Sequence, residues 1–114
     1  MAKLECRLHA PFDAVLNAID TAILRGSVSA SREDGSDFSA GGHRCAVRVY
    51  ERYSVIGSNR VSLNVTLLED GPGVLLSAIT SGGSQAVFFK INTFGEESFL
   101  DCVRDAVRQF GGNG

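Results

Sequence analysis

Hydrophobic and polar residues alternate along this chain in two different rhythms. Over residues 3–8 every second residue is apolar, and this period predicts a half-buried strand. Over residues 12–23 the apolar residues recur every three or four positions, which predicts an amphipathic helix. Pro11 suits the first helical position, and Gly26 is expected to end the helix in the left-handed conformation. The chain is therefore expected to begin with a strand followed by a helix.

Residues 27–92 have the pattern of strands joined by tight turns. Alternation is clear over residues 44–52 and clearest over residues 60–67, where apolar and polar side chains occupy opposite faces. Turn-forming residues occur at positions 33–35, 41–42, 56–59, 70–73 and 81–84. Residues 74–80 and 85–92 are predicted as two further strands, joined as a hairpin by residues 81–84.

A second helix is predicted to close the chain. Thr93 and Glu96 have the spacing of a capping box, in which each side chain bonds a free amide at a helix start. An apolar stripe with helical spacing continues to Phe110, and Gly111 is expected to end the helix.

The predicted order is β-α-β-β-β-β-β-α, which belongs to the α+β class. Short turns between strands require antiparallel neighbours, so we expect a curved antiparallel sheet of about six strands. Both helices need an apolar surface, and one face of the sheet provides it. The order is similar to that of a helix-grip fold or a TATA-binding-protein-like fold. Residues 1–110 are predicted as a single domain and residues 111–114 as a flexible tail.

The amino-acid composition argues against several classes of function. The net charge of −2 argues against a nucleic-acid partner, because phosphate binding depends on clustered Lys and Arg. No apolar run approaches the roughly 20 residues that span a membrane. The N-terminal residues lack the pattern of a signal peptide, and the three cysteines suit free thiols rather than a disulfide framework. We expect a cytoplasmic protein with no cofactor and no metal site.

Four segments together resemble a family of known sequence but unknown role. They read ILRGSVSASREDGSDF, RCAVRVYERYS, NRVSLNVTLLEDG and ITSGGSQAVFFKINTFGEESFL, and they cover most of residues 20–100. In these segments the chain resembles a small, single-domain bacterial family of unknown function. The resemblance implies a bacterial, cytoplasmic, single-domain protein and implies no activity, cofactor or catalytic residue.

The first candidate site is the loop formed by Ser81, Gly82, Gly83, Ser84 and Gln85. Amides beside glycines can form a concave nest for an anion, and serine hydroxyls add donors. The nearby Arg48 and Arg52 could contribute charge to the same ligand. The same Gly-Gly pair is also typical of a tight hairpin that requires positive φ.

The second candidate is the polar face of the sheet. The alternation predicts that the polar residues of two neighbouring strands share one face, where they would form either an anion-binding surface or the interface of a homodimer. The predicted interface residues are Arg44, Arg48, Tyr50, Arg60, Ser62 and Asn64. A solvated sheet face is the alternative.

No catalytic signature is present, since the two histidines stand in no recognisable nucleophile or metal motif. We therefore predict a non-enzymatic binding or interaction module that self-associates through its sheet. The alternative is a binder of a small anionic metabolite, through the loop at residues 81–85 and the neighbouring arginines. An enzyme of unknown type is the third hypothesis.

Overall fold

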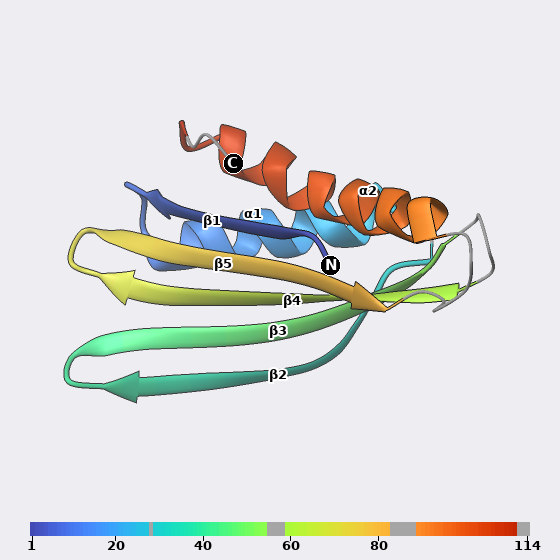
Figure 1. The fold of residues 1–114 in the computed structure, drawn as a ribbon. Helices are drawn as coiled ribbons and strands as arrows, with labels where there is room; N and C mark the ends of the chain where they lie inside the picture. The colour runs from blue at the N-terminus through green and yellow to red at the C-terminus, as the bar shows by residue number, and fades with distance from the viewer. Residues whose placement is uncertain (28, 55–58, 83–88, 112–114) are drawn as a thin grey trace.

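An antiparallel sheet with helices on one face makes up the fold (Figure 1). The computed structural model describes residues 1–27, 29–54, 59–82 and 89–111, and over these it contains five strands and two helices. The strands are β1 (Lys3–Leu8), β2 (Ser31–Ala40), β3 (His43–Ser54), β4 (Asn59–Asp70) and β5 (Gly73–Gly82). The helices are α1 (Phe12–Gly26) and α2 (Phe89–Arg108). The α+β class and the antiparallel sheet are thus confirmed.

The strands are arranged in the order β1-β5-β4-β3-β2, and every neighbouring pair is antiparallel. Strands β2 to β5 follow one another as a meander, whereas α1 carries the chain from β1 at one edge to β2 at the other. Gly41 and Gly42 connect β2 to β3 with φ angles of 59° and 81°. Two successive positive φ values are what a two-residue hairpin turn requires, and glycine adopts them without strain.

The core lies between the helices and the sheet. The predicted stripe of α1 is confirmed, since Phe12, Val15, Ile19 and Ile23 are all buried. Helix α2 buries Phe99, Leu100, Val103, Ala106 and Val107, and it packs against α1, β5, β4 and β1. The sheet contributes alternate residues of β1, β4 and β5. By contrast, β2 is exposed along almost its whole length, so the β2–β3 hairpin extends beyond the layer of helices (Figure 1).

The prediction of a sixth strand over residues 85–92 is wrong where the structure describes it. Residues 85–88 lie outside the described ranges, but residues 89–92 form the first turn of α2. Thr93 therefore lies within the helix and cannot cap its start. Glu96 is buried within α2, where its carboxylate lies 3.0 Å from the amino group of Met1. A short run of apolar residues is compatible with a buried helix as well as with a strand. The spacing of the apolar residues over residues 85–92 therefore did not distinguish the two.

Three smaller expectations also need correction. Residues 33–35 are not a turn but part of β2, which carries an irregularity in its pairing between Arg32 and Asp34. Gly26 is helical rather than left-handed, and Ser27 follows it in an extended conformation. Pro11 precedes the helix as its N-cap instead of occupying the first helical position. The turn predicted at residues 56–59 falls mainly outside the described residues.

Candidate interaction surface

The pairing of β3 with β4 decides which side chains share a face. Arg48 lies opposite Val65 and Tyr50 lies opposite Leu63, and both β4 residues are buried beneath the helices. Arg44, Arg48 and Tyr50 therefore belong to the helix-facing side of the sheet. Residues 60, 62 and 64 of β4 point the other way, away from the helices. The prediction that the polar residues of the two strands share one face is wrong.

Arg44 is engaged with α1 on the helix-facing side. Its guanidinium lies 3.1 Å from the carboxylate of Asp13 and 4.4 Å from the ring centroid of Phe12. The hydrogen bond from Arg44 lowers the pKa of the Asp13 carboxyl below its ordinary value. The pair attaches the start of α1 to β3.

Arg48 is engaged with the edge strand. Its guanidinium forms an ion pair with Asp37 at 3.1 Å and donates to the carbonyl oxygens of Val47 and Ser36. Gly35 leaves the room for this arrangement, because a Cβ at that position would lie 3.2 Å from the guanidinium. Arg48 therefore joins β3 to β2 through its own hydrogen bonds.

Tyr50 is fully buried and links β3 to the middle of α1. Its hydroxyl donates a hydrogen bond of 2.7 Å to Oδ1 of Asp20. Arg32 approaches the same carboxylate oxygen at 3.5 Å. Burial, together with the bond to Asp20, raises the pKa of Tyr50 well above the ordinary tyrosine value. The phenol is thus held in its neutral form.

Of the two arginines predicted to assist the loop at residues 81–85, Arg52 lies in the row nearer to it. It pairs with Val61, which in turn pairs with Gly82, so these residues form one row across the sheet. Its guanidinium lies 4.6 Å from the ring centroid of Phe99, and burial lowers its pKa. Ser81 and Gly82 belong to β5, whereas Gly83, Ser84 and Gln85 lie outside the described residues. The anion-binding role of this loop stays a prediction.

The face of the sheet turned away from the helices, which we call the open face, carries a different surface. Its most prominent feature is an apolar row in which Phe38 pairs with Cys45, Cys45 with Leu68, and Leu68 with Leu75. Phe38 is 61% exposed and Leu68 is 41% exposed. The row crosses β2, β3, β4 and β5 without interruption by a charged residue.

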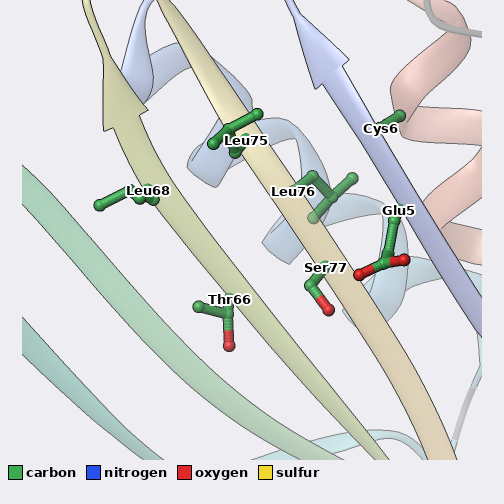
Figure 2. A pocket seen from close by; sticks show the side chains of 7 residues that line it. All are labelled: Glu5, Cys6, Thr66, Leu68, Leu75, Leu76 and Ser77. Carbon is green, nitrogen blue, oxygen red and sulfur yellow. The ribbon is translucent and has the colours of Figure 1, made fainter.

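A groove lies beside this row, between β1 and β4. It is lined by Glu5, Cys6, Thr66, Leu68, Leu75, Leu76 and Ser77. Figure 2 shows the short side chains of Ser77 and Thr66 next to the longer side chains of Leu75 and Leu68. The groove is therefore deepest at the short side chains. The groove is apolar at one end and polar at the other.

A second row of the open face, which we call the charged row, has opposite charges at its two ends. Asp34 pairs with Val49, Val49 with Asn64, Asn64 with Ile79, and Ile79 with Lys3. Within the residues that the structure describes, Asp34 forms no ion pair, and Lys3 approaches only Glu5, at 3.6 Å. The open face thus has a negative edge at β2 and a cation at the β1 edge in the same row.

The remaining predicted residues, Arg60, Ser62 and Asn64, also lie on the open face, where each forms a hydrogen bond or an ion pair with a neighbouring side chain. Ser62 donates a hydrogen bond of 3.2 Å to Glu51, and Arg60 forms an ion pair with the same carboxylate. Asn64 accepts a hydrogen bond of 3.1 Å from Thr66. Sequence reasoning thus located the polar part of this face. It missed the apolar row, although Leu68 follows these β4 residues in the same phase.

Two kinds of site receive no support from the described part of the chain. It contains no group of three or more His, Cys, Asp or Glu side chains placed to hold a metal ion. Within the same residues, no helix is both long and apolar enough to cross a membrane.

Comparisons with known proteins place the chain in a family without giving it an activity. No curated protein matches the sequence. A solved structure of a Pseudomonas aeruginosa protein of unknown function, PA94, whose description suggests a regulator, is similar with a TM-score of 0.51. It is 14% identical, and the match covers 70% of this chain and 68% of that one.

A second solved structure, TTHA0849 from Thermus thermophilus, has a TM-score of 0.38 and 12% identity over 97% of this chain and 99% of the other. At 14% identity the likeness to PA94 concerns the fold alone. The family model of DUF6054 matches residues 1–111, and the chain therefore belongs to this family of unknown function.

Proposed function

We propose that this protein is a non-enzymatic interaction module that binds a second copy of itself through the open face of its sheet. The observation that carries the proposal is the apolar row of Phe38, Cys45, Leu68 and Leu75. Exposed Phe and Leu side chains that are contiguous across several strands mark interaction surfaces more often than solitary exposed residues do. A second copy covers this row by packing sheet against sheet.

The size of the open face is sufficient for a stable dimer. Strands spaced by about 4.8 Å give the sheet a width of about 24 Å, and ten-residue strands are about 33 Å long. Complete overlap of two such faces buries on the order of 800 Å² on each copy, which is the size of a standard specific interface. The other face has no comparable area to offer, because the helices cover it.

Sedimentation equilibrium in the high micromolar range tests the proposal. The wild-type protein is expected to have the mass of a dimer, and Leu68→Asp is expected to have the mass of a monomer, because the charge falls within the apolar row on the middle strand. Leu24→Asp is the matched control, since Leu24 has a similar exposure of 38% but lies on α1, away from the open face. A wild-type monomer at these concentrations would refute the proposal, as would equal effects of the two substitutions.

A further inference from the structure

We infer that the two copies pack about a two-fold axis parallel to the strands and centred on β4, so that Lys3 of each copy faces Asp34 of the other and Phe38 contacts the margin of the other copy's groove. This inference rests on the proposed function and adds to it the mode of docking. Strand β4 is the middle strand of the described sheet. Rotation about an axis along it therefore places β5 over β3 of the second copy, and β1 over β2.

The two halves of the open face differ in shape. Phe38 projects from β2 and is the most exposed aromatic side chain in the described residues. The groove beside Leu75 and Ser77 lies on the opposite half of the same face (Figure 2). The two-fold axis brings Phe38 over Arg7, which forms an ion pair with Asp70, and the ring therefore reaches the groove only at its margin beside Leu75. One face thus supplies both the projecting side chain and the surface that it contacts, as an isologous interface requires.

The charged row is also complementary to the same row of the second copy. The same rotation places Lys3 against Asp34 of the second copy, and Ile79 against Val49. Asn64 meets its own equivalent at the axis, where two amides can exchange hydrogen bonds. Each dimer therefore contains two equivalent ion pairs, one at each margin of the interface.

The alternative two-fold axis, perpendicular to the strands, does not bring the complementary parts of the open face together. It would place each strand over its own equivalent in reversed direction. When this axis is centred on the row of Glu5, Lys3 faces Arg7 and Glu5 faces a second Glu5, so in that register the β1 edges repel each other. Like charges brought together across an interface oppose association. In every register this axis also keeps β2 over β2 of the second copy, so Asp34 cannot face Lys3 and Phe38 cannot reach the groove.

Charge reversal tests the predicted pairing. Lys3→Glu and Asp34→Lys are each expected to weaken dimerisation by about three- to tenfold, because each places like charges at both margins. A mixture of the two single variants is expected to form heterodimers in preference to either homodimer, since both margins of the heterodimer again hold opposite charges. The double variant is expected to recover the wild-type dissociation constant. Glu5→Lys is the matched control, because Asp34→Lys should not rescue it.

Chemical cross-linking tests the position of Phe38. In a Cys6→Ala, Cys45→Ser background, Phe38→Cys combined with Arg7→Cys is expected to give a covalent dimer with a short bis-maleimide, which spans the gap of about 10 Å between facing sheets. Within one chain these positions lie on the two edge strands, about 19 Å apart, which exceeds the reach of the reagent. Phe38→Cys with Ser81→Cys in the same background is the matched control. It is expected to remain monomeric on a denaturing gel.

The two proposals fail in different ways. A wild-type monomer refutes self-association and this docking mode together. A wild-type dimer that shows neither heterodimer preference nor the cross-link between positions 38 and 7 refutes the docking mode and leaves self-association standing.

Discussion

The Cβ that Gly26 lacks would lie 2.8 Å from the Sγ of Cys102, so the end of α1 and the middle of α2 approach each other at this glycine. Gly26→Ala is therefore expected to destabilise the fold by about 1–2 kcal/mol through crowding. In a Cys102→Ala background the same change is expected to be neutral or stabilising, because the sulfur is gone and alanine favours the helix. Urea denaturation of the four proteins in this cycle measures the coupling. A coupling energy of zero would contradict the steric role of Gly26.

The buried hydrogen bond of Tyr50 gives a second prediction. Tyr50→Phe removes the donor to Asp20 while preserving the ring, and the loss is expected to cost about 1–2 kcal/mol of unfolding free energy. Tyr53→Phe is the matched control, since Tyr53 belongs to the same strand but is 57% exposed on the open face. Chemical denaturation should show a clear shift for Tyr50→Phe and almost none for Tyr53→Phe. Equal shifts would contradict the role of the buried bond.

The raised pKa of Tyr50 predicts an alkaline limit to stability. Its phenol is neutral in the fold, whereas in the unfolded chain it ionises around the ordinary tyrosine value of 10.0. The pKa of Tyr50 is higher in the folded protein than in the unfolded chain. The contribution of the neutral phenol to the unfolding free energy is therefore complete below pH 10 and is lost as the pH rises towards the folded pKa. Unfolding free energies measured from about pH 8 upwards should fall less steeply for Tyr50→Phe than for the wild-type protein. If the unfolding free energies of the two proteins fell equally with pH, the loss of stability would not come from the ionisation of Tyr50.

The contact between Arg44 and Asp13 gives a prediction at acid pH. The folded pKa of Asp13 is depressed below 3.8 by the hydrogen bond from Arg44. Its contribution to stability is therefore present above the ordinary carboxyl pKa and is lost as the pH falls through the folded value. Carbon-detected NMR titration should find the Asp13 midpoint below the ordinary value and should find it raised in Arg44→Gln. An unchanged Asp13 midpoint in Arg44→Gln would show that Arg44 does not lower the pKa of Asp13.

The sequence predicted the elements that have one apolar phase. The stripe of α1 and the alternation of β4 each place apolar residues on a single side, and the structure buries those residues. The buried face of strand β3 was harder to predict, because Val47 and Val49 point to one face of the sheet while Ala46 and Tyr50 point to the other. The inward phase also contains arginines, which look solvent-facing in a one-dimensional pattern. Arg48 is accommodated there because the hairpin extends past the helices and brings a carboxylate of β2 within reach.

The start of α2 was missed for a different reason. Thr93 and Glu96 have the letters of a capping box, but the same spacing also occurs within helices and does not identify an end by itself. Whether an apolar run becomes a strand depends on a free sheet edge beside it, and β1 already pairs with β5 at that edge. The pairing of the N-terminal strand with the last strand is a long-range contact that local patterns do not reveal.

Strand β2 limits how an assembly of this protein can grow. It is an edge of the sheet, yet it carries Glu33, Asp34 and Asp37 and an interruption in its regular pairing. Carboxylates and irregular backbone on an edge hinder the addition of another strand. Lateral polymerisation into continuous ribbons is therefore obstructed at this side, and association through the open face leads to a closed pair with a fixed stoichiometry rather than to a fibre.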